Sequence, residues 1–351
     1  MNVKSIWEKL VNWELWPFKL RYLAITPVWI WYCLRSGSVW FFSSSNPTIT
    51  FGGFEGEGKK EMYEQLPKDL YPKTIYIQPG EPKEILLKKL TDHGFTYPFC
   101  VKPDVGMKGL LFRKVDQEKA LLYYHQNMQV EYIIQDLVLY PLEISVFYYR
   151  YPNQKKGVIT GFIQKELMEV IGDGKSKIIE LIQAHPKAKY RLEEMRIKHA
   201  DNLEMVLPKG ERFFLTYAAN LNRGARFVNL KHEIDEDLHL IFDELSLNTN
   251  FYYGRYDIKC KSIEDLKQGK NFVILEFNGS GAEPNHVYNM GYSLFQAYKE
   301  ILMHWKVLFR ISRYNHRNGT PYWSFLKGWK FLQQSKKHFE ILEEWDTKIL
   351  I

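Results

Sequence analysis

Cysteine is scarce and irregularly spaced in this chain. Only Cys33, Cys100 and Cys260 occur among its 351 residues, an odd number without any CxxC pair. This spacing indicates neither a disulfide framework nor a structural zinc site. A reducing compartment is therefore the expected location.

Long apolar runs are also absent from the sequence. The most apolar N-terminal window, Tyr22–Leu34, contains Pro27 and is shorter than the ~20 residues that a spanning helix needs. Residues 1–12 carry mixed charge instead of the basic start and apolar run of a secretory signal. We therefore expect a cytoplasmic protein, and peripheral contact with a membrane remains open.

Tryptophan is missing from the middle of the chain, and acidic residues are missing from part of its C-terminal end. No tryptophan lies between Trp40 and Trp305, and no Asp or Glu lies between residues 301 and 339, where lysine and arginine alternate with aromatic residues. The net charge of +7 does not by itself indicate nucleic acid. The basic aromatic segment has three interpretations: amphipathic helices packed on the N-terminal ones, an anionic membrane surface, or, least favoured, nucleic acid.

The chain is long enough for two or three lobes, and its alternating helix and strand patterns predict an α/β fold with mixed α+β character. We expect a Trp-rich helical extension over residues 1–50 and an N-terminal lobe over 51–94. A small subdomain is expected over 95–160, a large subdomain with the metal site over 161–298, and a basic aromatic helical tail over 299–351.

Local patterns also predict individual elements. Helices are expected within 1–35 and at 60–65, 82–91, 177–184 and 235–245. Strands are expected at 74–77, 99–103, 110–115, 130–137, 143–150, 161–165, 253–259 and 272–278.

Two glycine-containing segments are candidates for binding an anion. Gly52–Lys59 contains four glycines before a predicted helix, but it lacks the spacing of a phosphate loop, so a connecting loop is an equal alternative. Lys102 ends a predicted strand and faces the turn Asp104–Gly109, where backbone N–H groups and a lysine can hold phosphate oxygens. A purely structural hairpin would have the same pattern.

The strongest chemical pattern is a set of oxygen ligands on two predicted neighbouring strands. Glu276 and Asn278 are two residues apart and therefore point to the same face of one strand, and Asp257 on the other strand can point there too. Two carboxylates and an amide oxygen suit Mg²⁺ that bridges nucleotide phosphates. A solvated face of charged residues is the alternative.

This set, followed by the small-residue turn Gly279–Gly281, resembles the metal-binding strands of the ATP-grasp superfamily, and D-alanine:D-alanine ligase is the most similar branch. Tyr97–Pro103 resembles the strand that carries the first ATP lysine of that family, Lys102 here. The segment Gly106–Gly109, with Lys108, resembles the loop that covers the phosphates.

Further motifs follow in the order that the family has. Asp136 and Glu143 resemble the acidic pair at the adenine hinge and the ribose, and Arg255 resembles the arginine that steadies the tetrahedral intermediate. Val170–Leu181 and Asn220–Gly224 are similar to the cyanophycin-synthetase-like carboxylate–amine ligases.

Some positions depart from the family pattern. Gln135 stands where the adenine hinge usually carries a glutamate. Glu283 adds a carboxylate near the expected substrate position, which is consistent either with a cationic substrate group or with an ordinary surface turn. Residues 1–50 match no part of the family.

The resemblance implies an ATP-dependent ligase that activates a carboxylate as an acyl phosphate and joins it to an amine, with amino acids or peptide-like molecules as substrates. It implies Asp257, Glu276 and Asn278 as ligands of one or two Mg²⁺ ions, with Mn²⁺ as a substitute. Arg255 and Lys165 are the implied catalytic residues. The implied nucleotide contacts are Lys102, Gly106, Lys108, Gly109, Asp136, Glu143 and Lys165.

Two other functions fit the same motifs. An ATP-grasp kinase would transfer the phosphoryl group and would need the same metal ligands. An inactive grasp fold could instead serve as a module that binds membranes or polyanions, although a decayed site has no physical reason to retain all three oxygen ligands.

Overall fold

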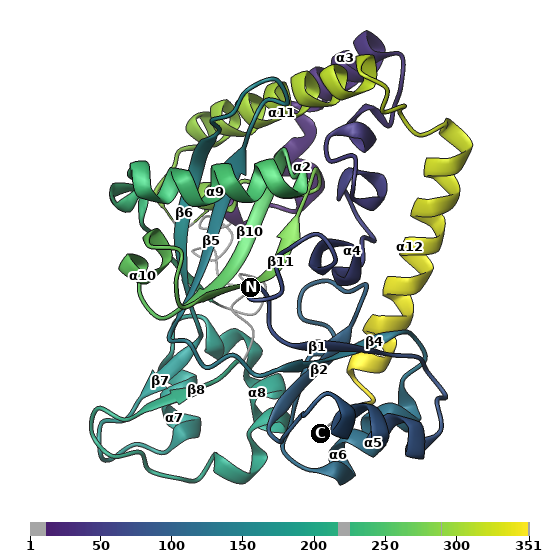
Figure 1. Ribbon diagram of the computed structural model, residues 1–351. Coiled ribbons are helices and arrows are strands. Elements are labelled where there is room, and N and C mark those ends of the chain that lie inside the picture. Colours follow the sequence, from purple (N-terminus) through teal and green to yellow (C-terminus); the bar gives the residue numbers. More distant parts are fainter. Residues whose placement is uncertain (1–11, 217–224, 289, 350–351) are drawn as a thin grey trace.

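The computed structural model describes residues 12–216, 225–288 and 290–349, and it contains two main antiparallel sheets and a small third one (Figure 1). One sheet has four strands in the order β1-β4-β2-β3, another has five in the order β11-β10-β5-β6-β9, and β7 pairs with β8. The predicted α/β class is confirmed. The predicted motif Asn220–Gly224 and the first part of the N-terminal helical pattern lie outside the described residues.

The strands have the following bounds: β1 Thr74–Ile77, β2 Phe99–Pro103, β3 Arg113–Val115, β4 Tyr132–Asp136, β5 Leu142–Tyr149, β6 Val158–Glu166, β7 Glu169–Ile171, β8 Arg212–Phe214, β9 Arg226–Asn229, β10 Tyr253–Cys260 and β11 Phe272–Asn278. The α-helices are α2 Phe18–Leu23, α3 Thr26–Ser36, α4 Lys59–Tyr63, α5 Lys83–Asp92, α6 Glu118–Asn127, α7 Ile178–Ala184, α8 Leu192–Lys198, α9 Glu236–Thr249, α10 Ile263–Lys267, α11 Leu294–Arg317 and α12 Phe325–Asp346. The 3₁₀ turns are η1 Trp13–Leu15, η2 Phe41–Ser44, η3 Thr50–Gly52, η4 Ala188–Arg191, η5 Ala200–Asn202, η7 Lys231–Glu233 and η8 Asn285–Val287.

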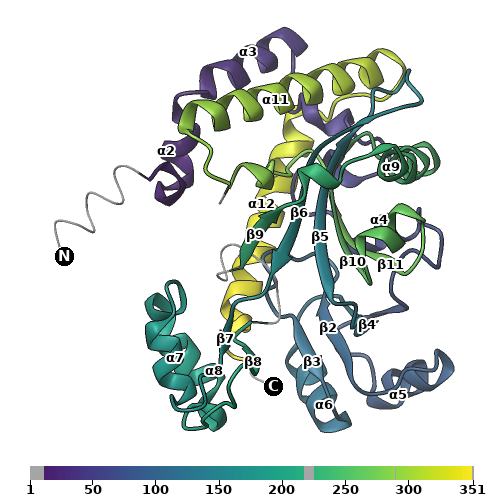
Figure 2. The same ribbon diagram turned by 90° about the vertical axis from the view of Figure 1, so that its left-hand side faces the viewer.

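The five-stranded sheet has one apolar and one polar face, because successive side chains of a strand point in opposite directions. On β10, Tyr256 and Ile258 pack with Phe242 of α9 in the main hydrophobic core. Arg255 and Asp257 point to the other face and line a large pocket. Helix α9 therefore covers one side of this sheet and leaves the other side to the pocket (Figures 1 and 2).

The four-stranded sheet has its own hydrophobic core and lies below the larger sheet in Figure 1. Strand β1 comes from residues 51–94, which were expected as a lobe of their own, and it pairs with β4 at the edge of this sheet. Phe339 and Leu342 of α12 pack into the same core. A strand from residues 51–94 and a helix from the C-terminal tail thus both contribute to this lobe.

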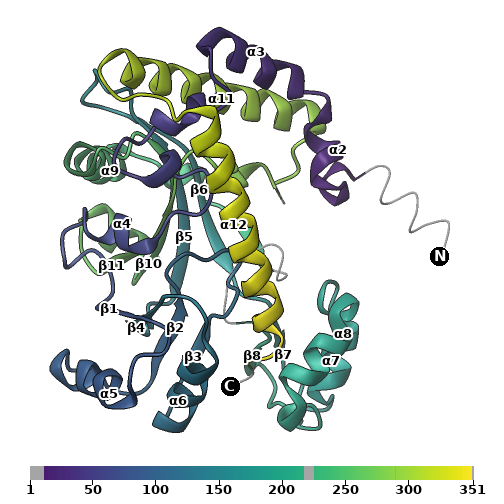
Figure 3. The ribbon, with the colours of Figure 1, turned by 90° about the vertical axis from the view of Figure 1, so that its right-hand side faces the viewer.

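The N-terminal helices and the C-terminal tail pack against each other. The ring of Trp29 on α3 lies 5.1 Å from that of Trp305 on α11, and the ring of Tyr32 stacks at 4.6 Å on that of Phe309. Helix α12 then runs from this helical layer down to the four-stranded sheet (Figure 3). No helix in the described part of the chain is both long enough and apolar enough to cross a membrane.

The loop between β2 and β3 is longer than predicted. A strand was expected from residue 110, but β3 begins only at Arg113. Lys108, Gly109 and Leu111 all have positive φ angles. This left-handed backbone cannot continue a strand, so the segment turns instead.

The small-residue stretch Ser43–Asn46, which precedes the glycine loop, is buried. Asn46 donates hydrogen bonds to the carbonyl oxygens of Gly52 and Tyr253, at 3.0 and 2.9 Å. Its side-chain oxygen accepts from the N–H groups of Tyr252 and Tyr253. One buried side chain thus fastens the glycine loop to the start of β10.

Candidate active site

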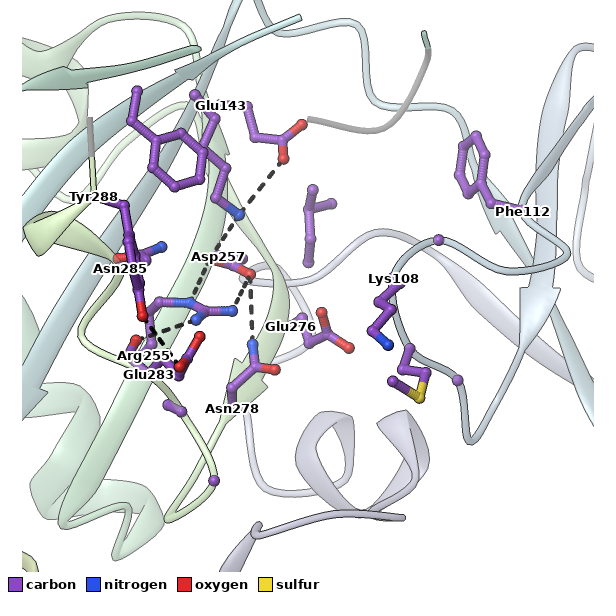
Figure 4. A pocket seen from close by; sticks show the side chains of 18 of the residues that line it. Lys108, Phe112, Glu143, Arg255, Asp257, Glu276, Asn278, Glu283, Asn285 and Tyr288 are labelled. Atoms are coloured by element: carbon purple, nitrogen blue, oxygen red, sulfur yellow. Dashed lines mark hydrogen bonds and ion pairs between the residues drawn. The ribbon is translucent and has the colours of Figure 1, made fainter. Parts of the chain in front are cut away.

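A cavity of about 2240 Å³ lies between the two main sheets, and all eleven residues selected from the sequence line it. They are Lys102, Gly106, Lys108, Gly109, Asp136, Glu143, Lys165, Arg255, Asp257, Glu276 and Asn278. Figure 4 labels Lys108, Glu143, Arg255, Asp257, Glu276 and Asn278 among them. The first and the last of the eleven residues, Lys102 and Asn278, are more than 170 positions apart in the sequence. Their convergence makes this cavity the candidate active site.

The three predicted metal ligands are held by the pairing of β10 with β11. Asp257 stands directly opposite Glu276, and Arg255 stands opposite Asn278. The register shifts at Leu275, which is left without a partner on β10. This irregularity is typical of a β-bulge, a feature that redirects side chains next to functional sites.

Asp257 is the electrostatic centre of the pocket. Its Oδ1 lies 2.9 Å from Lys165 Nζ and 3.2 Å from Arg255 Nε, and it accepts a hydrogen bond of 2.7 Å from Ser145 Oγ. Burial by itself raises the pKa of this carboxyl, but Arg255 and Lys165 outweigh it and hold the pKa of Asp257 well below its usual range. Asp257 is therefore ionised at all physiological pH values.

Glu276 and Asn278 complete the oxygen set. Glu276 Oε1 lies 3.4 Å from Lys59 Nζ, and Asn278 Nδ2 donates to Asp257 Oδ2 at 3.4 Å. In this orientation the amide oxygen of Asn278 points away from Asp257. Two carboxylates and an amide oxygen on adjacent strands have the hard-oxygen chemistry that a magnesium ion requires, so the residues present fit such an ion.

Glu143 lies next to the metal-ligand set on the neighbouring strand. It stands opposite Lys165 on β6 and opposite Lys259 on β10, and its Oε1 is 3.8 Å from Lys165 Nζ. Burial raises the pKa of Glu143, although the nearby lysines oppose that shift. Lys165 therefore connects the predicted ribose contact with the predicted metal site.

The predicted phosphate-covering loop follows Lys102, and helix α12 holds both of its flanks. His338 Nε2 lies 2.8 Å from the carbonyl oxygen of Val105, and Asp346 Oδ1 accepts a 2.7 Å hydrogen bond from the N–H of Leu111. Lys108 enters the pocket from the side opposite Glu276 (Figure 4). The C-terminal tail thus anchors a part of the candidate active site.

The predicted adenine hinge is placed at the edge of the pocket. Asp136 is half-exposed and forms an ion pair of 3.5 Å with Lys73. Gln135 is buried, and its amide nitrogen donates to the hydroxyls of Tyr63 and Thr74 at 3.0 and 2.7 Å. The glutamine that departs from the family pattern is therefore bound into the wall of the pocket.

The glycine loop contributes several pocket residues that were not selected from the sequence. Glu57 and Lys59 both line the cavity, and burial raises the pKa of Glu57 to about 7. The loop is fixed, since the N–H groups of Ser280 and Gly281 donate to the carbonyl oxygens of the first two loop glycines. A Cβ on Gly281 would approach the Phe54 carbonyl oxygen to 1.9 Å, so glycine is required there. In the sequence, the glycines that precede Lys59 were the signal that could have identified this loop as part of the pocket.

Glu283 is bound to tyrosines from distant parts of the chain. Its Oε1 accepts hydrogen bonds from Tyr22 Oη at 2.5 Å and from Tyr288 Oη at 3.2 Å. Its backbone carbonyl lies 3.4 Å from Arg255 Nη1. Through Tyr22, the N-terminal extension therefore touches the turn that follows the metal-binding strand. Tyr22, Trp29 and Trp305 line this end of the cavity.

No family model matches the sequence, and no curated protein matches it. Solved structures similar to this chain include a bifunctional glutathione synthetase from Pasteurella multocida, with 13% identity, a TM-score of 0.42, and coverage of 71% of this chain and 36% of that one. A D-alanine–D-alanine ligase from Bacillus anthracis has 14% identity, a TM-score of 0.42, and coverage of 75% and 69%. The ATP-grasp ligase PsnB complexed with a minimal precursor has 12% identity, a TM-score of 0.38, and coverage of 70% and 60%.

The chain spans only about a third of the length of the glutathione synthetase. At these low identities and TM-scores, the roles of individual residues depend on the geometry of this chain alone.

Proposed function

We propose that this protein is an ATP-dependent carboxylate–amine ligase. The observation that carries the proposal is the convergence of the eleven selected residues on one cavity between two sheets. The reaction would transfer the γ-phosphoryl group of ATP to a substrate carboxylate, and an amine would then displace phosphate to form an amide. This chemistry requires neutralised charge and exclusion of water more than it requires a covalent nucleophile.

The charges of the pocket support binding of a polyphosphate with a divalent cation. Asp257 pairs with Lys165 and Arg255, and Glu276 pairs with Lys59. A nucleotide brings phosphates for the cations and a metal for the carboxylates, so the buried charges remain balanced when it binds. Lys102, Lys165 and Lys59 are the proposed phosphate contacts, and Glu143 is the proposed ribose contact.

Asp257, Glu276 and Asn278 are the residues that would hold Mg²⁺ or Mn²⁺. When bound, the ion would neutralise charge on the β- and γ-phosphates. Arg255 has its guanidinium beside Asp257 and near the Glu283 carbonyl, where it can stabilise the oxyanion formed by attack on the acyl phosphate.

The loop between β2 and β3 would exclude water from the acyl phosphate. Lys108 and Gly109 lie at the tip of this loop and line the cavity, opposite the proposed metal ligands. Because α12 binds the flanks at Val105 and Leu111, movement would be confined to the residues between them. Closure there would bring Lys108 toward the phosphates.

A phosphate-release screen over amino acids, dipeptides and other small acids, each with and without an amine, tests the proposal. A ligase releases free phosphate only when both substrates are present, whereas a kinase leaves the phosphoryl group on its acceptor. We expect Glu276→Gln and Lys102→Ala to abolish turnover while the fold is retained. Undiminished turnover in the first variant would refute the metal site, and undiminished turnover in the second would refute the nucleotide site.

We further propose that the helical layer of α3 and α11 docks on an anionic membrane. A groove of about 360 Å³ between these helices is lined by aromatic residues and by five cations without an acid. The cations are Arg35, Lys306, Arg310, Arg313 and Arg317. On α3, Trp31 and Leu34 are 56% and 72% exposed. Exposed apolar side chains beside cations suit lipid tails and anionic head groups.

Co-sedimentation with vesicles tests this docking surface. We expect binding to vesicles that contain phosphatidylserine and much weaker binding to pure phosphatidylcholine. Replacing Arg310 and Arg317 by Gln should remove about 2 kcal/mol of binding free energy, at ~1 kcal/mol per cation. This loss corresponds to a roughly 30-fold decrease in partitioning onto the vesicles. Lys209→Gln, an exposed residue in another part of the chain, is the control and should bind like the wild type. Failure to bind anionic vesicles at low salt, or binding to oligonucleotides alone, would refute membrane docking.

A further inference from the structure

A second cluster of ligand-type side chains lies where η8 meets α11. His286 Nε2 is 3.2 Å from Glu300 Oε1, and His304 Nε2 is 3.7 Å from the same oxygen. The three ligand atoms all lie within 4.8 Å of one another. Among the residues that the structure describes, no other group of three His, Cys, Asp or Glu side chains comes this close together.

The fold positions each member of this cluster before any ligand binds. Glu300 and His304 are separated by four residues on α11, so they lie on the same face of the helix. His286 follows Asn285, whose amide donates to Ser145 Oγ at 3.2 Å. The imidazole of His286 rests on Gly161, where an added Cβ would meet Nδ1 at 2.1 Å. The glycine therefore provides the space that the ring occupies.

Hydrogen bonding within the protein satisfies the cluster only in part, because His286 Nε2 contacts Glu300 while other ring nitrogens have no partner. His304 is 1% exposed, yet its Nε2 has no hydrogen-bond partner, and neither has Nδ1 of His286. A buried polar atom left unpaired costs about 1–3 kcal/mol, so each such atom in a folded protein calls for an explanation. The unpaired Nε2 of His304 faces Glu300, which is the direction from which a ligand would bind.

We propose that His286, Glu300 and His304 bind one Zn²⁺ ion through the two Nε2 atoms and the Glu300 carboxylate. Two imidazoles and one carboxylate are a donor set that zinc accepts, with a fourth position left for water or substrate. With metal–ligand bonds of 2.0–2.1 Å, tetrahedral ligand atoms lie about 3.3 Å apart. The present separations of 3.2 and 3.7 Å from Glu300 Oε1 are close to this value, and all three ligand atoms lie within 4.8 Å of one another.

The surroundings of the cluster support the same assignment. Nδ1 of His304 lies 3.5 Å from Tyr253 Oη, where it can donate a proton and keep Nε2 available for the metal. His304 also lines the large cavity, so this member of the cluster adjoins the proposed active site. The few cysteines excluded a cysteine zinc site, but a site built from histidine and glutamate does not depend on them. Zinc binding here requires no nucleotide, so this proposal and the ligase proposal can fail separately.

Metal titration of the full chain tests the site. After chelator treatment, we expect one Zn²⁺ per chain to bind in the presence of excess Mg²⁺, and Co²⁺ in its place to show the visible absorption of a low-symmetry site. X-ray absorption of the zinc form should count two imidazole ligands. Absence of bound zinc, or a site with one or no imidazole, would overturn the proposal without the use of any variant.

Variants then assign the ligands. Glu300→Gln and His304→Ala should each weaken zinc binding by at least ~100-fold, more than changes to outer partners typically do. Gly161→Ala should weaken it by displacing His286, while the exposed His232→Ala should bind zinc like the wild type. Circular dichroism and thermal melting check that each variant is folded. Wild-type zinc affinity in a folded His304→Ala protein would refute the assignment.

Discussion

Replacing Asp257 by asparagine should destabilise the protein and should do so in a pH-dependent manner. The change keeps the size of the side chain but leaves two cations in a buried place without their counter-ion. Lys165 would retain Glu143 at 3.8 Å, whereas Arg255 would retain the carbonyl oxygen of Glu283 at 3.4 Å and the more distant charges of Glu276 and Glu283. Breaking a buried pair typically costs 3–5 kcal/mol, and the partner that Lys165 keeps places the expected loss near ~3 kcal/mol.

The sign of the pH effect follows from the depressed pKa of Asp257. A carboxyl with a folded pKa below its unfolded value of ~3.9 stabilises the protein above that pH, and this stabilisation is lost as the pH falls. The free energy of unfolding of the wild type should therefore exceed that of the variant by a nearly constant amount between about pH 5 and 8. This difference should shrink below about pH 4.

Urea unfolding at pH 7.5, 5.5 and 3.5 measures this difference in free energy, and a thermal melt should show a decrease of roughly 4 °C at neutral pH. Asp136→Asn is the matched control, because its ion pair with Lys73 is half-exposed and should be worth less than ~1 kcal/mol. Equal stability of wild type and Asp257→Asn at pH 7.5, or a gap that persists unchanged at pH 3.5, would refute the charge balance described for the pocket.

Three further changes test other parts of the site. The pKa of Glu57 is raised to about 7, so the stability that comes from its protonated form is lost as the pH rises through 7. Glu57→Gln should therefore be more stable than the wild type by about 3 kcal/mol at pH 8 and equal to it near pH 4, as urea unfolding would show. Gly281→Ala places a Cβ 1.9 Å from the Phe54 carbonyl oxygen and should lower the unfolding free energy by at least ~2 kcal/mol; an unchanged midpoint would contradict the close packing of the glycine loop. Asp346→Asn weakens the acceptor of the Leu111 N–H and should raise hydrogen exchange there more than elsewhere in the loop, and unaltered exchange would refute anchoring by α12.

The local patterns of the sequence were sufficient for most elements and for the candidate site. Periodic apolar residues predicted β1 and β2 with their observed bounds, because strand alternation is a local property of the chain. The spacing of Glu276 and Asn278 places both side chains on one face whatever the rest of the fold does. Asp257 could be assigned to the same face only through the resemblance, since nothing local aligns one strand with another.

Contacts between distant segments were decided by the tertiary structure alone. The Asn46 side chain fastens the glycine loop to β10, Tyr22 binds Glu283, and α12 holds the flanks of the phosphate loop. Each contact joins residues that are far apart in the sequence, so no local sequence pattern indicates it. Such partners meet only because the folded chain brings them close together. The His286, Glu300 and His304 cluster belongs to this class too. Composition and spacing thus determined the fold class and the candidate chemistry, while packing determined which terminal segments enclose the pocket and where buried nitrogen atoms remain unpaired.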